Sequence, residues 1–567
     1  MKNLEKLDLS SNRFSDNLPQ CLSNLSKLRV LDLTNNMLSG NFPSFIVNLT
    51  SLEYISLHEN DIEGTFLLRT LANHSKLEVL HLLSRSSMLQ VETENPQWHP
   101  TFRLKSLILQ RCNLNMKSGR TIPTFLLFQN NLKYVDLSHN NMVGTFPSWL
   151  MQNNYGLKVF ILRNNSLVVN SFEGNIPSSI GEMRQLMSLD LSNNRFIGEI
   201  AEQLITNCTY LQYLRLSNNF LQGQIIPKSL TQTWLEYLYL NNNNFSGKVE
   251  EAVGNITSLT VMDISNNSIS GQIPSSIGRC SFLKVLLMAE NQLEGQIPSG
   301  LFNLQYLEIL DLSHNKLSRS GPNLNLTSLR FLHLQNNGLS SSITYMFSMT
   351  SKLEVLDLRD NKFSGHIPTW ISKFSKLAVL LLGGNNFRGH IPIKLCEIKT
   401  YSMLDLSHNK FNGSIPSCIA NLPFQVPEYV DYHPRFEIFP SRGPLYDAVT
   451  FEDIYSNAIM KLNEDFLQTI GNPNICGPLL RSYMGNTPPS PVLQSDEGES
   501  KEGAIDVMAF YWSFAGAYVS ILLGLAVVLC INVHWRLTWF RLVDRLLLYI
   551  NVQQHMAWFC LVDRCIP

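Results

Sequence analysis

Leucines recur at fixed intervals through the first 422 residues, and mostly polar residues fill the positions between them. The segment LEKLDLSSNRF at Leu4 returns as LRVLDLTNNML at Leu28 and as LEYISLHENDI at Leu52. The shared frame is L-x-x-L-x-L-x-x-N-x-L, often followed by G-x-I-P, and most copies start 24 residues apart. Seventeen copies start at positions 4, 28, 52, 77, 104, 132, 157, 186, 211, 235, 259, 283, 307, 329, 353, 377 and 401. Such a fixed period predicts a repeat architecture.

Each copy of the frame predicts one short strand with a single buried face. Leu310 and Leu312 alternate with polar residues, which is the period of a strand. Asn315 stands where the chain turns away, and its amide can satisfy buried backbone groups at that turn. No repeat can bury its apolar face alone, so neighbouring repeats must stack. The pattern therefore predicts an α/β solenoid over residues 1–422, curved around a concave parallel sheet.

The repeat resembles the leucine-rich repeat of plant extracellular type, whose mark is an SGxIPxxL segment. This segment stands as SGQIPSSIG at 270–278 and as EGQIPSGLFNL at 294–304. The resemblance covers residues 1 to about 422 and implies a plant-type leucine-rich-repeat superhelix.

The residue between the two strand leucines should face the concave side. Aspartate fills eight of these 17 places, so we interpret it as scaffold: Asp8, Asp32, Asp136, Asp190, Asp263, Asp311, Asp357 and Asp405. Arg215 and Tyr239 replace it in consecutive repeats, and Tyr213 and Tyr237 precede them on the same face. Aromatic residues and arginine are the usual anchors of protein recognition. We predict a peptide or protein contact patch on an open surface, with an ordinary variable solvent face as the alternative.

Composition and motifs argue against catalysis and against nucleic-acid binding. The net charge is −1, and only 16% of residues are charged. The chain has no G-x-S-x-G, Walker loop, H-E-x-x-H or kinase signature, and its cysteines lack zinc-site spacing. His314 and His408 fall beside the Asn turn, as repeat-variable surface positions. We therefore expect a protein that is no enzyme and that needs no cofactor or metal.

An apolar run follows the repeats. Residues 507–535 contain no Asp, Glu, Lys or Arg, and about 20 apolar residues suffice to cross a bilayer. An acidic spacer at 486–506 precedes the run, and arginines follow it. Positive residues stay on the cytosolic side. The sequence therefore predicts one C-terminal transmembrane helix at 507–533, with the repeats outside and a short cytoplasmic tail at 534–567.

Small residues recur every four positions within the predicted span, at Gly516, Ser520 and Gly524. This spacing lets two helices approach closely in a bilayer. It predicts a lateral partner, although ordinary membrane composition would give the same pattern.

Sequons for N-glycosylation recur through the repeats. There are ten: Asn24, Asn48, Asn73, Asn164, Asn207, Asn244, Asn255, Asn266, Asn325 and Asn412. A chain rich in Asn and Ser makes such triplets by chance, but the apolar run favours the secretory pathway. We expect a glycoprotein.

The repeat pattern stops after residue 422. Residues 423–470 carry aromatic residues without the leucine period, as a non-repeat island. The segment GNPNICGPLL, within 471–485, resembles the C-terminal cap of plant leucine-rich-repeat receptors, but the cap's usual second cysteine is missing. Met1 begins almost inside a repeat, without a signal peptide or N-terminal cysteine cap. We therefore expect a truncated product, an incomplete gene model or a pseudogene-like relative.

The whole arrangement resembles plant receptor-like proteins, the cell-surface receptors that lack a kinase. The resemblance implies a plasma-membrane receptor that binds an extracellular peptide, protein or pathogen-derived ligand. Such receptors signal through a partner receptor kinase, mostly in defence and sometimes in development. Two alternatives stay open: a truncated non-functional or decoy fragment, and a repeat protein that inhibits a secreted enzyme. A receptor kinase is disfavoured, because a kinase domain does not fit into residues 534–567.

Overall fold

The computed structural model describes residues 3–94, 98–168, 176–228, 230, 233–319, 326–343, 351–422 and 474–476. The chain divides into two compact units, Met1–Gly485 and Asn486–Pro567, and all described residues belong to the first. The predicted island, spacer, membrane helix and tail lie outside the described residues, as do Gly516, Ser520 and Gly524. Within the described part of the chain, no helix combines the length and apolarity that a membrane crossing requires.

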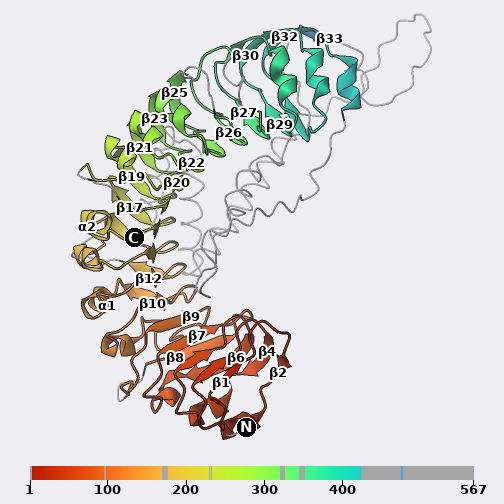
Figure 1. Ribbon diagram of the computed structural model, residues 1–567. Helices are drawn as coiled ribbons and strands as arrows, with labels where there is room; N and C mark the ends of the chain where they lie inside the picture. Colours follow the sequence, from red (N-terminus) through yellow and green to blue (C-terminus); the bar gives the residue numbers. More distant parts are fainter. Residues whose placement is uncertain are drawn as a thin grey trace, which may run out of the picture. The chain divides into compact units, whose positions relative to one another are not determined.

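One parallel sheet of 17 strands runs through the first unit, with one strand from each predicted repeat (Figure 1). Each strand pairs with that of the next repeat, as Leu286 does with Leu310. The strands are β1 (Lys6–Asp8), β3 (Val30–Asp32), β5 (Tyr54–Ser56), β7 (Val79–Leu83), β9 (Ser106–Gln110), β10 (Tyr134–Asp136), β12 (Val159–Ile161), β14 (Ser188–Asp190), β16 (Tyr213–Arg215), β18 (Tyr237–Tyr239), β20 (Val261–Asp263), β22 (Val285–Leu287), β24 (Ile309–Asp311), β26 (Phe331–His333), β27 (Val355–Asp357), β29 (Val379–Leu381) and β31 (Met403–Asp405). The predicted parallel sheet is confirmed.

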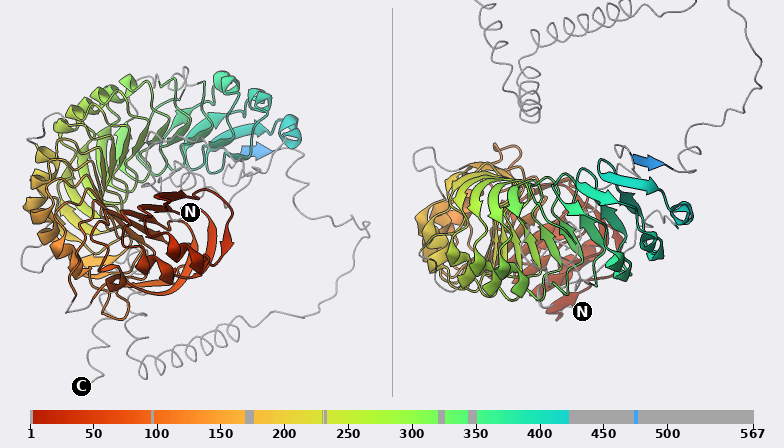
Figure 2. Two further views of the ribbon diagram at one scale, coloured as in Figure 1. Left: turned by 60° about the horizontal axis from the view of Figure 1, so that its bottom comes forward. Right: turned by 90° about the horizontal axis from the view of Figure 1, so that it is seen from above.

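Short helices cover the other face of this sheet, so that within the first unit the strands line the inner side of the curve (Figure 2). Most are single 3-10 turns, and most follow a proline such as Pro274 or Pro298 of the G-x-I-P segments. They are η1 (Gln20–Asn24), η2 (Ser44–Asn48), η3 (Leu68–Leu71), η4 (Thr124–Phe128), α1 (Ser148–Asn153), η5 (Ser178–Glu182), α2 (Glu202–Asn207), η6 (Glu251–Asn255), η7 (Ser275–Arg279), η8 (Ser299–Asn303), η9 (Thr369–Lys373), η10 (Ile393–Glu397) and η11 (Ser417–Asn421). The narrow strand side and the wider helical side give the solenoid its curvature.

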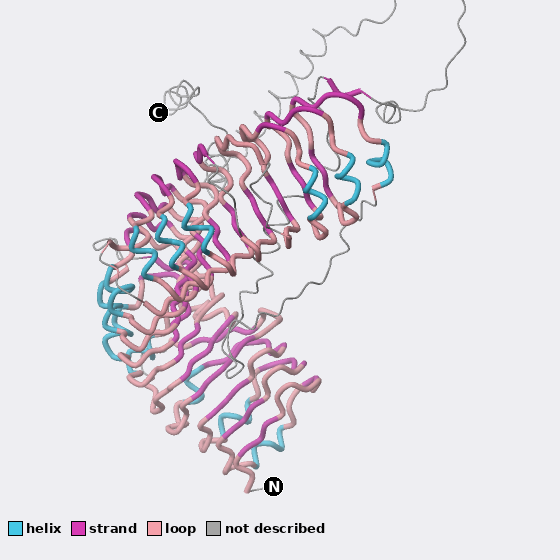
Figure 3. Tube along the Cα trace, turned by 45° about the horizontal axis from the view of Figure 1, so that its top comes forward, coloured by secondary structure: helices cyan, strands magenta, loops and turns pink. Residues whose placement is uncertain are grey.

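A second set of short strands forms smaller parallel sheets beside the main one (Figure 3). They are β2 (Ser15–Asp16), β4 (Met37–Asn41), β6 (Asp61–Leu67), β8 (Leu89–Glu92), β11 (Val143–Thr145), β13 (Ser166–Val168), β15 (Ile197–Glu199), β17 (Phe220–Gly223), β19 (Asn244–Lys248), β21 (Ser268–Gln272), β23 (Gln292–Gln296), β25 (Lys316–Arg319), β28 (Ser364–Gly365), β30 (Asn386–Gly389), β32 (Lys410–Ser414) and β33 (Asn474–Cys476). Gly271 and Gly295 have φ near +77° and +79° there, which glycine adopts at little cost. The strand β33 pairs with β32, so the cap-like segment continues the stack.

Buried asparagines tie each repeat to the repeat before it. Asn315 Nδ2 donates to the carbonyl of Met288 at 2.9 Å and to that of Ser313 at 3.0 Å. Its Oδ1 accepts a hydrogen bond from the backbone N–H of Leu293 at 2.9 Å. The asparagine column therefore satisfies buried backbone groups, which confirms its predicted role.

A disulfide joins Cys396 on η10 to Cys418 on η11. The two cysteines lie 22 residues apart, and stacking brings their helices together on the outer side. Sequence analysis missed this bond because the two cysteines are close only across neighbouring repeats. Disulfides persist in oxidising compartments, so the bond favours the secretory pathway.

Candidate ligand-binding face

The first outward residue of each main strand forms an apolar lane on the concave face from β16 to β31. Its members are Tyr213, Tyr237, Val261, Val285, Ile309, Phe331, Val355, Val379 and Met403. Alternation along a strand separates them from the leucines of the main core. Val285 is 0% exposed and Val379 is 8% exposed. The lane is thus a second hydrophobic cluster, on the opposite face of the sheet from the main core.

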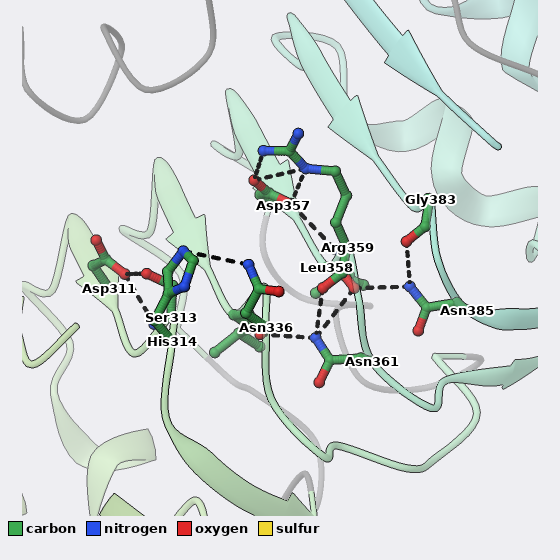
Figure 4. A network of polar contacts seen from close by, with 11 residues as sticks. Asp311, Ser313, His314, Asn336, Asp357, Leu358, Arg359, Asn361, Gly383 and Asn385 are labelled. Carbon is green, nitrogen blue, oxygen red and sulfur yellow. Dashed lines mark hydrogen bonds and ion pairs between the residues drawn. The ribbon is translucent and has the colours of Figure 1, made fainter. Parts of the chain in front are cut away.

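The second outward residue of each strand forms a mixed lane beside the apolar one, from Arg215 on β16 to Asp405 on β31. Its aspartates bond within their own repeats: Asp311 Oδ1 accepts a hydrogen bond from the backbone N–H of Ser313 at 3.0 Å. Asp357 accepts the corresponding hydrogen bond from the backbone N–H of Arg359 at 3.1 Å and also pairs with the guanidinium of Arg359 at 2.8 Å (Figure 4). These bonds support the interpretation of the aspartates as scaffold.

The predicted contact residues come together where the apolar lane begins. Tyr213 pairs in register with Tyr237, and Arg215 with Tyr239, on neighbouring strands. The ring centroid of Tyr213 lies 6.0 Å from that of Tyr237 and 5.8 Å from that of Tyr239. The guanidinium carbon of Arg215 lies 5.5 Å from the ring centroid of Tyr239. We call these four residues the Tyr–Arg cluster.

The cluster is less open than the sequence predicted. Tyr237 and Tyr239 are 7% and 4% exposed, so the expectation of an open surface is wrong for their rings. Aromatic rings on adjacent strands pack against one another, and the apolar lane continues beside them. Burial raises the pKa of Tyr237 to about 12, which keeps its hydroxyl protonated.

Arg215 carries a buried donor within the cluster. Its Nε atom has no hydrogen-bond partner among the described residues. The neighbouring aspartate in the mixed lane, Asp190, accepts a hydrogen bond from the backbone N–H of Ser192 at 2.9 Å. A buried N–H without a partner costs about 1–3 kcal/mol. Arg215 as a whole is half-buried, so other parts of its guanidinium can contact a ligand beside the ring of Tyr239.

Sequence analysis did not identify the apolar lane as a feature. It examined only the mixed lane from repeat to repeat, where aspartate is the commonest residue. The missed signal was the first outward column, which from Tyr213 to Met403 has no charged residue. In earlier repeats Lys6, Ser106 and Ser188 interrupt the same column.

Eight of the nine sequon asparagines that the structure describes are exposed, namely Asn24, Asn48, Asn73, Asn164, Asn207, Asn244, Asn266 and Asn412. Asn255 is half-buried, and its Nδ2 donates to the carbonyl of Leu230 at 2.7 Å. Asn325 lies outside the described residues. The exposed amides are accessible to glycosylation, which stays a prediction.

The concave face also contains a buried histidine, and it makes stability depend on pH. His81 is 4% exposed, and its Nε2 lies 2.8 Å from Ser106 Oγ. Burial, with a smaller contribution from His58, lowers the pKa of His81 to about 3. Between pH 6.5 and 3 the unfolded chain therefore binds the proton while the folded chain does not, so stability falls as pH falls.

We predict that, between pH 7 and pH 5, the free energy of unfolding of the parent chain falls by roughly 2 kcal/mol more than that of His81→Gln. Urea unfolding of both proteins at the two pH values measures this difference. The exposed His314→Gln is the control, and an equal pH response in all three proteins would contradict the prediction.

The family described as Leucine Rich Repeat matches several stretches of the chain. One family profile matches residues 2–62, 184–245 and 327–387, and a shorter one matches 131–153, 258–280, 306–325 and 402–422. Receptor-like protein 13 of Arabidopsis thaliana is 43% identical over 274 residues, which cover 41% of this chain and 25% of that protein. The chain thus spans about a quarter of the length of the curated relatives it matches.

Solved ectodomains of plant receptor kinases share the fold. The ectodomain of GASSHO1/SCHENGEN3 from Arabidopsis thaliana, in complex with CASPARIAN STRIP INTEGRITY FACTOR 2, is 27% identical with a TM-score of 0.64. The match covers 84% of this chain and 53% of that one. The Arabidopsis receptor kinase HAESA, in complex with the peptide hormone IDA and the co-receptor SERK1, is 26% identical with a TM-score of 0.59. That match covers 84% of this chain and 79% of the other.

Proposed function

This chain is a leucine-rich-repeat protein related to the plant receptor-like proteins, and from that premise we propose that its concave face binds an extracellular peptide or protein. The observation that carries the proposal is the Tyr–Arg cluster, in which Arg215 lies over the ring of Tyr239 and both Tyr213 and Arg215 stay partly exposed. Binding hot spots are fully desolvated pockets rich in Tyr, Trp and Arg. The Tyr–Arg cluster has this composition, and its partly exposed members Tyr213 and Arg215 are the ones that a ligand would cover.

The apolar lane indicates the chemistry of the ligand. The lane runs over nine strands spaced about 4.8 Å apart, seven of them beyond the Tyr–Arg cluster, so its whole length is roughly 40 Å. A peptide lying along this track would place a side chain against the partly exposed Tyr213 and a backbone or carboxylate oxygen near the guanidinium of Arg215. The receptor kinase HAESA, which shares this fold, has been solved with the peptide hormone IDA, and this supports the same use of the fold here.

The signal would leave through another protein. We propose a single membrane helix at 507–533, a plasma-membrane location with the repeats outside, and a receptor kinase that contacts Gly516, Ser520 and Gly524. The disulfide Cys396–Cys418 supports an oxidising environment for the repeats. We propose a role in plant defence, which is what the resemblance of the sequence to plant receptor-like proteins implies.

The test is ligand selection followed by substitution. Random peptides displayed on phage are selected against the purified full chain. The triple variant Tyr213→Ala, Tyr237→Ala, Tyr239→Ala should then bind the selected peptide at least tenfold more weakly, because truncating a hot-spot aromatic costs about 2 kcal/mol or more. Calorimetry gives both affinities.

Tyr54→Ala is the matched control. Tyr54 occupies the same outward column on β5, seven repeats before β18, and it packs against His81 rather than the cluster. Its loss should leave peptide affinity within twofold of the parent chain. If the triple variant and the control bind the selected peptide equally, the concave cluster is not the binding site.

A further inference from the structure

A row of exposed aromatic residues lies outside the concave face, in the turns that lead into the main strands. Tyr210, Trp234, Phe282 and Tyr306 each directly precede the first leucine of a repeat. Their exposed fractions are 56%, 64%, 59% and 57%, whereas the leucines that follow them are at most 3% exposed. Ser258 holds the same position in the repeat between Trp234 and Phe282. We call these five positions the aromatic rim.

Backbone hydrogen bonds keep the rim in one line. Two residues after each rim position, a backbone N–H donates to the carbonyl at the same place in the preceding repeat. Glu236 N–H donates to Gln212 at 2.8 Å, and Lys284 N–H donates to Thr260 at 2.9 Å. Successive rim positions therefore lie about 4.8 Å apart, and the row extends over about 20 Å.

The rim differs from the same turn elsewhere in the chain. Repeats on either side carry lysine at this position, at Lys27, Lys76, Lys352 and Lys376. The frame thus accepts a charged residue here, and packing does not require an aromatic ring. Exposed apolar residues that gather on a surface rimmed by polar residues mark interaction sites. The rim is such a surface, and it is separate from the Tyr–Arg cluster.

The order of residues along the rim is symmetric about its centre. It reads aromatic, aromatic, Ser258, aromatic, aromatic. A two-fold axis through Ser258 would place Trp234 against Phe282 of a second copy, and Tyr210 against Tyr306. The flanking charges obey the same axis, because Glu236 and Lys284 stand one repeat to either side of the centre and carry opposite signs. A second copy would therefore place unlike charges opposite one another at Glu236 and Lys284, beside the paired aromatic rings.

We infer that the aromatic rim is a homodimer interface centred on Ser258. The four rings, each a little over half exposed, offer about 100 Å² apiece, so the aromatic contact buries about 800 Å² in the pair. Stable interfaces bury about 1,200–2,000 Å². The pair is therefore a weak dimer in dilute solution, and its population rises where both copies are held at high local concentration.

Cysteine crosslinking of the full chain tests the dimer. Ser258→Cys, in a Cys21→Ser background that removes the exposed free thiol of the described residues, places one thiol on the proposed axis. Mild oxidation in cell membranes should give a disulfide-linked dimer on a non-reducing gel, because two thiols join only when their Cα atoms come within about 7 Å. Ser51→Cys and Ser328→Cys, at the same turn outside the rim, should crosslink at least tenfold less.

Aromatic substitution links the crosslink to the rim. Trp234→Ser with Phe282→Ser should lower the Ser258→Cys dimer yield at least tenfold, whereas Lys352→Ser with Lys376→Ser should leave it unchanged. Because the exposed Asn207 lies three residues before Tyr210, each pair is also measured with Asn207→Gln, which removes a possible sugar. The inference is overturned if Ser258→Cys crosslinks no more than Ser51→Cys, both with and without Asn207→Gln. It is also overturned if the yield of the Ser258→Cys dimer does not change when Trp234 and Phe282 are replaced. Crosslinking mainly to another protein would overturn it as well.

Discussion

Replacing Asn315 with alanine should lower the free energy of unfolding by about 4 kcal/mol, an effect expected from losing a buried hydrogen-bond network. The side chain is 9% exposed and bonds both its own turn and the preceding repeat. Alanine would leave the N–H of Leu293 and the carbonyl of Met288 without these partners. Each such buried group costs about 1–3 kcal/mol, and the neighbouring repeats cannot separate to admit water without losing core contacts.

Urea unfolding followed by circular dichroism measures the loss. Asn303→Ala is the matched control, because Asn303 is exposed at the end of η8, twelve residues before Asn315. The control should change stability by less than about 0.5 kcal/mol, as surface substitutions usually do. Equal stability of the two variants would show that the asparagine column is not what holds the repeats together.

Removing the disulfide should have the second largest effect. Cys396→Ser with Cys418→Ser should cost about 3 kcal/mol, because the bond closes a loop of 22 residues and limits the freedom of the unfolded chain. Contacts in a solenoid join only neighbouring repeats, so the loss should concentrate near the bond. Hydrogen exchange should accelerate in β29 and β31 and stay unchanged in β3 and β5.

Cys21→Ser controls for the loss of a thiol, since Cys21 is exposed and unbonded. Reduction of the parent chain should reproduce the exchange pattern of the double variant. Faster exchange spread evenly over all repeats would argue against a local clamp and for one cooperative unit.

The two predictions differ in what the sequence could supply. The frame places an asparagine at one position per repeat, and its amide chemistry already implied a role at the turn. Cys396 and Cys418 occupy no fixed place in the frame, so their pairing depended on how η10 and η11 stack.

The candidate site likewise has features that the sequence predicted and features that only the structure shows. The alternation of the strand frame placed Tyr213, Arg215, Tyr237 and Tyr239 on one face of adjacent strands, and the structure brings them together. It could not give their exposure, because burial depends on how rings from neighbouring strands pack. Nor could it show that Arg215 Nε lacks a partner among the described residues, since that depends on the direction the side chain takes toward Tyr239.

The sequence by itself determined the solenoid, its 17 strands and the parallel register, because the period of the leucines fixes which residues stack between repeats. Contacts within one repeat, or between equivalent positions of neighbouring repeats, follow directly from that period. Only the tertiary structure decided the disulfide, the burial of Tyr237 and Tyr239, and the Arg215 Nε that has no partner among the described residues. These features depend on side-chain directions and helix stacking, which vary between repeats while the period stays the same.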